Sequence, residues 1–202
     1  MQINNDIHKL NWYKSIFIHG KWYLVSSLIT KGIGILLLPV YTRYLLPEEY
    51  GILNGLNSIA RLLPIFISLY LDSAFGRFFH EKKYNHNELK KLFSTIYTFV
   101  LSFGSFCIIF TIISSNFWLK SFFTVDVWPY AFLAFIPPLF LQIGMLGLVF
   151  LRQSLLARET TFLEIITTII TVIVTLPLLI IFDLGVIARL WGGVFSALFL
   201  FV

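Results

Sequence analysis

The chain has 202 residues, of which 58% are hydrophobic and only 12% are charged. Soluble domains carry about 25% charged residues, so this composition excludes a soluble globular protein that must cover its core with a polar surface. The net charge of +5 does not indicate nucleic-acid binding, because the Lys and Arg residues flank long apolar runs and form no continuous basic face. The composition therefore predicts an integral membrane protein.

The first segment, residues 1–21, mixes polar residues with apolar ones such as Ile7, Trp12 and Phe17. We expect it to be a cytoplasmic, interfacial amphipathic segment, with an irregular tail as the alternative. No small-residue cleavage site follows a short apolar core, so we expect no removed signal peptide. The first helix should therefore remain as an anchor.

Six apolar runs follow, each close to the ~20 residues that cross a bilayer. They are residues 22–44, 50–71, 92–114, 128–151, 162–182 and 184–202. These runs predict an all-α integral membrane protein, a bundle of about six transmembrane helices. Because the last run continues to the end of the sequence, we expect the chain to be the N-terminal lobe of a longer transporter, or a truncated product.

The distribution of basic residues predicts the orientation in the membrane. The N-terminal segment and the second and fourth connections hold ten of them, namely Lys9, Lys14, Lys21, Arg77, Lys82, Lys83, Lys90, Lys91, Arg152 and Arg158. The opposite connections hold Lys120, with Arg43 near the edge. The positive-inside rule then predicts a cytoplasmic N-terminus.

The second run carries a polar stripe. Its members are Asn54, Asn57, Ser58, Arg61, Ser68 and Asp72, which a continuous helix would gather within about 100° of its circumference. Polar groups at membrane depth usually face a protein interior or a water-filled cavity, so the stripe predicts a cavity lining. Asp72 could alternatively pair with Arg77 at the end of the helix.

The fifth run has a similar face, composed of Thr161, Glu164, Thr168, Thr171 and Thr175. Such a face can line a cavity, or its small hydroxyl residues can permit close helix packing. Glu164 fits poorly in a dry interface, although it could also extend to the membrane surface. Prolines within the runs predict bent helices, and the sequence contains no phosphate-binding loop, metal-binding His pair or activated nucleophile. We therefore expect no enzyme activity, no cofactor and no metal.

The stretch from Lys31 to Glu81 resembles the N-terminal signature of a known family. It contains K-G-I-G-I-L-L-L-P-V-Y-T-R-Y-L-L-P-E-E-Y-G and, after about 20 mostly apolar residues, A-F-G-R-F-F-H-E. The matching positions are Lys31, Gly32, Pro39, Tyr41, Thr42, Arg43, Leu45, Pro47, Tyr50, Gly51, Arg77, Phe78 and Glu81. The signature is similar to that of the Wzx-type polysaccharide flippases of the multidrug/oligosaccharidyl-lipid/polysaccharide (MOP) exporter superfamily.

The resemblance implies a transporter with two lobes around a cationic cavity. Such flippases move undecaprenyl-diphosphate-linked oligosaccharide, an O-antigen or capsule repeat unit, to the outer leaflet of the bacterial inner membrane by alternating access, and in many members an ion gradient drives them. It implies the lipid-linked oligosaccharide, membrane lipids and other polysaccharide-assembly proteins as partners. On this basis we expect Arg61, Lys31 and Arg43 to bind the diphosphate. We expect a cavity lining of Asn54, Asn57, Ser58, Ser68, Thr168 and Thr171, and ion coupling at Asp72 and Glu164.

Three alternatives stay open at this point. A multidrug cation antiporter of the same superfamily would need carboxylates in the cavity. An integral membrane glycosyltransferase could use Glu48 and Glu49 as its acid pair, although their connection is short. A truncated, inactive membrane fragment is the third.

Overall fold

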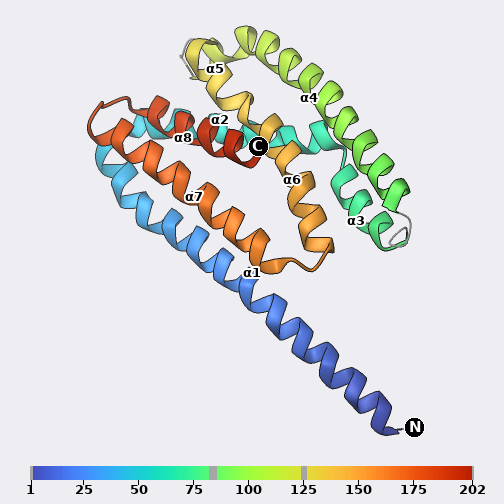
Figure 1. Ribbon diagram of the computed structural model, residues 1–202. Helices are drawn as coiled ribbons and strands as arrows, with labels where there is room; N and C mark the ends of the chain where they lie inside the picture. Colours follow the sequence, from blue (N-terminus) through green and yellow to red (C-terminus); the bar gives the residue numbers. More distant parts are fainter. Residues whose placement is uncertain (1, 82–85, 124–126, 202) are drawn as a thin grey trace.

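The computed structural model describes residues 2–81, 86–123 and 127–201, and the side chains of residues 20–80, 87–119, 121–122 and 128–201. In this part of the chain the regular structure is helical (Figure 1). The elements are α1 (Gln2–Tyr44), α2 (Pro47–Ser68), α3 (Leu71–Glu81), α4 (His86–Phe123), α5 (Val127–Phe135), α6 (Pro137–Gln153), α7 (Ala157–Ile180) and α8 (Val186–Phe201).

Five stretches of helix are long and apolar enough to cross a membrane: Gly20–Tyr44, Pro47–Ser68, Asn87–Leu119, Trp128–Gln153 and Ala157–Ile180. The sixth predicted run is α8, which is apolar but has only 16 residues. At 1.5 Å per residue it spans about 24 Å, less than the ~30 Å hydrocarbon core. The predicted all-α membrane fold is confirmed.

Large apolar side chains cover the outside of the bundle. Leu36 is 74% exposed, Ile113 is 66% exposed and Phe117 is 90% exposed. In water these surfaces would be unfavourable, because a soluble monomer rarely exposes extended apolar patches. In a bilayer they lie against lipid chains, so the exposed surface agrees with the composition.

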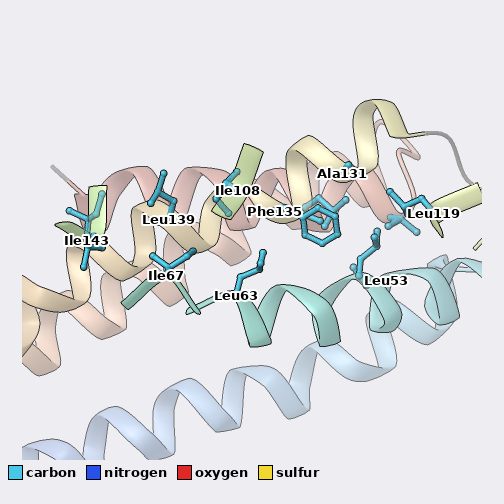
Figure 2. Close-up of a cluster of buried hydrophobic side chains, with 14 of the residues drawn as sticks. Leu53, Leu63, Ile67, Ile108, Leu119, Ala131, Phe135, Leu139 and Ile143 are labelled. Carbon is cyan, nitrogen blue, oxygen red and sulfur yellow. The ribbon is translucent and has the colours of Figure 1, made fainter. Parts of the chain in front are cut away.

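The helices form two groups that meet at α8 (Figure 1). On one side α1 runs along α7, and α7 packs closely against α8. On the other side α2, α4, α5 and α6 enclose the main apolar core (Figure 2). In Figure 2, Leu63 and Ile67 of α2 face Phe135 of α5 and Leu139 of α6. Because α8 also packs against α5 and α6, it joins the two groups.

The second predicted run, residues 50–71, is not one continuous helix. α2 ends at Ser68, and the next two residues, Leu69 and Tyr70, have left-handed φ values of 47° and 59°. Asp72 therefore belongs to α3, and Ser68 is buried, with its hydroxyl oxygen accepting a hydrogen bond from the Tyr70 N–H at 3.2 Å. The prediction of one continuous polar stripe is wrong beyond Ser68, because the chain changes direction at Leu69 and Tyr70 before Asp72.

Three other boundaries differ from the predicted runs. α4 continues to Phe123, where we had expected a connection after residue 114, because the following residues include no Pro or Gly to stop the helix. The fourth run is divided into α5 and α6 at Pro137. α1 includes the predicted interfacial segment in one helix of 43 residues. The side chains of residues 1–19 lie outside the described part, so the interfacial position stays a prediction.

Candidate functional site: a polar cleft where the two helix groups meet

Two adjoining cavities of about 280 and 250 Å³ lie where the two helix groups meet. They share the lining residues Leu141, Thr171, Arg189 and Ser196, so we treat them together as the polar cleft. α2 and α5 contribute to the first cavity, α1 contributes to the second, and α6, α7 and α8 contribute to both. Segments far apart in the sequence thus surround one space.

Two arginines give the polar cleft its charge. Arg61 of α2 is exposed along the first cavity, and the half-buried Arg189 of α8 lies between the two cavities. Neither guanidinium forms an ion pair with a described residue, and no described Asp or Glu lines either cavity. Two cations without a nearby carboxylate make the cleft electropositive, which favours an anionic ligand.

Uncharged polar groups complete the lining. The hydroxyls of Thr168 and Thr171 donate to the carbonyl oxygens of Glu164 and Thr167, each at 2.9 Å. Their own oxygens can still accept hydrogen bonds from a ligand. Asn57 adds an amide, which both donates and accepts. Such a mixture suits a ligand rich in hydroxyl groups.

Close packing of α7 against α8 positions Arg189. Gly192 has no room for a Cβ atom, because one would meet the Thr175 hydroxyl and the Thr171 carbonyl oxygen.

Thr175 is fully buried and Thr161 is 2% exposed. The α7 face that we predicted is therefore divided. Thr175 serves helix packing and Thr161 is buried outside the cleft, whereas Thr168 and Thr171 line the cleft.

The structure brings together four of the predicted site residues, namely Arg61, Asn57, Thr168 and Thr171. The others lie outside the set that lines the polar cleft. Lys31, Arg43, Asn54 and Ser58 are exposed, and the Ser58 hydroxyl donates to the Asn54 carbonyl at 2.8 Å. Lys31 follows Thr30, which does line the second cavity. The roles of these four exposed residues stay predictions.

Glu164 is held by two partners at one end of α7. Its Oε1 pairs with Arg152 Nη2 of α6 and its Oε2 accepts from the Ser26 hydroxyl of α1, both at 2.5 Å. The carboxylate is 24% exposed, so it ties three helices together and does not extend freely to the surface. Asp72 is half-buried on α3, and its Oδ1 has no hydrogen-bond partner among the described residues. Ion coupling at Glu164 and Asp72 stays a prediction.

Arg189 is the residue that the sequence analysis missed. Its neighbours along the chain are Leu190, Trp191 and two glycines, so it belongs to no polar stripe. A signal was present, since an ionisable residue inside an apolar run marks a candidate functional site by itself. Only the packing of α8 against α7 and α2, however, shows that Arg189 shares a cleft with Arg61.

The fold and the cleft together define a multi-pass α-helical membrane protein with a cationic polar cleft. Comparison with known families names the class more closely. A family model described as "Polysaccharide biosynthesis protein" matches residues 19–201, which is most of the chain. The chain therefore belongs to the polysaccharide biosynthesis protein family, the family of the Wzx-type flippases, whose members are membrane transporters rather than enzymes.

A curated relative is an "Uncharacterized membrane protein" of Haemophilus influenzae, which is 34% identical over 88 residues. The match covers 44% of this chain and 21% of the relative. No solved structure matches the chain. The relative supports a membrane protein and gives no information about a substrate.

Proposed function

We propose that the chain is the N-terminal lobe of a flippase for undecaprenyl-diphosphate-linked oligosaccharide, an O-antigen or capsule repeat unit. The protein would lie in the bacterial inner membrane with a cytoplasmic N-terminus, as the positive-inside rule predicts. The observation that carries the proposal is the pair of arginines in the polar cleft, Arg61 and Arg189. A diphosphate is an anion that guanidinium groups bind well, and Asn57, Thr168 and Thr171 offer partners to sugar hydroxyls.

The same observation argues against a drug-cation antiporter. A cation site needs carboxylates, and the described carboxylate nearest in sequence to the α7 lining, Glu164, is already paired with Arg152. The glycosyltransferase hypothesis also loses support, because the Glu49 carboxylate accepts the Leu46 N–H at 2.9 Å. Glu49 thus caps the start of α2 and stabilises the helix dipole there.

Genetic complementation tests the proposal. A bacterial strain that lacks its own flippase would receive the full gene, and surface glycan would be measured. We expect Arg61→Ala and Arg189→Ala each to reduce surface glycan at least tenfold, because a charge-assisted hydrogen bond contributes about 1.5–3 kcal/mol. The corresponding Lys substitutions should lose less, since they keep the charge but not the planar guanidinium.

Arg158→Ala is the matched control, since Arg158 is an exposed arginine of α7 outside the polar cleft. It should leave glycan export unchanged, and protein levels in the membrane should be equal for all variants. Normal surface glycan with both cleft arginines replaced would contradict the diphosphate assignment. Increased drug tolerance without any effect on glycan would favour the antiporter instead.

A further inference from the structure

A separate cavity, larger than either part of the polar cleft, lies between α3, α4 and α6. Its volume is about 700 Å³, within the roughly 300–1,000 Å³ of sites that bind small molecules. Its lining residues are Phe75, Phe79, Leu89, Lys90, Phe93, Gly147, Phe150, Gln153, Ser154 and Leu155. We call it the aromatic pocket. It shares no lining residue with the polar cleft, so a separate ligand must be considered.

The walls of the aromatic pocket are phenylalanines that hold one another in place. The rings of Phe75 and Phe93 meet edge to face with centroids 5.7 Å apart, and those of Phe79 and Phe150 have the same separation. Phe75 and Phe79 are only 1% and 8% exposed. Edge-to-face pairs of this kind are favourable beyond the area that they bury. The pocket is therefore a preformed apolar site.

One rim of the aromatic pocket is polar. The exposed Lys90 contributes the positive charge, and Ser154 and Gln153 contribute uncharged polar groups. The side chain of Gln153 is fixed by His80 of α3, whose Nε2 lies 2.8 Å from the Gln153 Oε1. An apolar interior with one cationic rim matches an amphiphile that has an apolar chain and an anionic head.

The position of the rim identifies the kind of amphiphile. The apolar run of α4 begins at Leu92, directly after Lys90 and Lys91, and α6 ends at Gln153, so the predicted spans place Lys90 and Gln153 near the level where the hydrocarbon core meets the headgroups. A lipid whose phosphate lies at that level would place its acyl chain beside the aromatic walls. Basic residues next to a membrane span attract anionic lipids by about 1 kcal/mol each.

We propose that the aromatic pocket binds one acyl chain of an anionic glycerophospholipid, with Lys90 contacting the lipid phosphate. This site is independent of the proposed transport function, because it shares no residue with the polar cleft. The bound lipid occupies the space between α3, α4 and α6 and so joins α3, which follows the bend at Leu69 and Tyr70, to the rest of the bundle.

Photocrosslinking tests the proposal in the full protein. The protein would be placed in phosphatidylcholine nanodiscs that contain phosphatidylglycerol with a diazirine on its acyl chain, and labelled residues would be mapped by mass spectrometry. We expect labelling at Phe93 and in the stretch 147–155. An added Cβ at Gly147 meets nothing within 4 Å, so Gly147→Leu should fill part of the pocket without a clash and reduce this labelling at least fivefold.

Gly20→Leu is the matched control for the leucine, because Gly20 also has open space around its Cβ position and lies outside the pocket. It should label like the unmodified protein. The charge is tested with Lys90→Gln and its neighbour Lys91→Gln, which is exposed but does not line the pocket. Lys90→Gln should reduce the preference of the pocket for phosphatidylglycerol over phosphatidylcholine by at least fivefold, the ~1 kcal/mol of one lysine near the membrane surface, and by more than Lys91→Gln, because only Lys90 lines the pocket.

Three results would overturn the proposal. The first is unchanged labelling in Gly147→Leu, with all variants unfolding at the same temperature. The second is an equal loss of lipid preference in Lys90→Gln and Lys91→Gln. The third is stronger competition by a polyprenyl phosphate than by phosphatidylglycerol, which would assign the pocket to the isoprenoid chain of a transport substrate.

Discussion

Gly192 is the position where the packing of α7 and α8 is most sensitive to one added carbon atom. A Cβ at this position would lie 2.9 Å from the carbonyl oxygen of Thr171 and closer still to the hydroxyl of Thr175. Real Cβ atoms do not approach other atoms so closely, and Thr175 is fully buried, so its hydroxyl has little room to move. Gly192→Ala should therefore separate the two helices, and overpacking of this kind costs about 1–3 kcal/mol.

The expected loss can be measured as thermal unfolding in a mild detergent. A change of 1 kcal/mol shifts the midpoint by about 2–4 °C for a chain of this size, so Gly192→Ala should unfold about 2–12 °C lower. Gly193→Ala is the control, because the adjacent glycine has nothing within 4 Å of its Cβ position. Since alanine has the higher helix propensity, this control should unfold at the same temperature or slightly higher.

A double variant separates the two contacts of Gly192. Adding Thr175→Ala to Gly192→Ala removes the hydroxyl but leaves the Thr171 carbonyl, so it should restore only part of the loss. Arg189 lies one helical turn before Gly192 on α8, and any outward shift of α8 should also weaken glycan export. An unfolding midpoint for Gly192→Ala equal to that of Gly193→Ala would refute the close approach of α7 and α8.

Two further predictions concern the ends of α7. Gly185→Ala should destabilise the chain by about 1–2 kcal/mol, the cost of a left-handed conformation for an L-residue. Gly185 has φ = +52°, and the Glu49 carboxylate occupies the space that a Cβ would need. Thermal unfolding measures the loss, and an unchanged midpoint would contradict the prediction. Two turns into α7, Glu164→Gln should cost more than Ser26→Ala. The first removes the ion pair and leaves Arg152 without its partner, whereas the second removes one hydrogen bond to a carboxylate, worth about 1.5–3 kcal/mol. The reverse order would show that Arg152 contributes little.

The helical spans were predictable from the sequence because a bilayer leaves few other possibilities. In hydrocarbon every backbone N–H and C=O must be paired within the protein, so a long apolar run forms a helix. The breaks between helices were less predictable. Pro137 marks the division between α5 and α6, but the bend at Leu69 and Tyr70 is formed by residues that rarely adopt left-handed conformations. No local pattern indicates that bend, and the predicted stripe fails beyond Ser68 for this reason.

The candidate site was predictable only in part, for a related reason. Helical spacing correctly grouped Asn57 with Arg61 and Thr168 with Thr171, because each pair lies on one face of one helix. Spacing within a helix cannot show which faces of different helices meet. Arg189 therefore had no partner in the sequence, although in the fold it lies beside both pairs.

The carboxylates at the two ends of α7 explain why the polar cleft is positive. Glu164 is bound by Arg152 and Ser26 at the start of α7, and Glu49 caps α2 beside Gly185 in the turn that follows α7. Both carboxylates fix helices and neither lines the cleft. Arg61 and Arg189 consequently have no described counter-ion, and two cations at membrane depth are costly unless water or an anion compensates them. A diphosphate would supply that compensation, whereas a cationic drug would increase the repulsion.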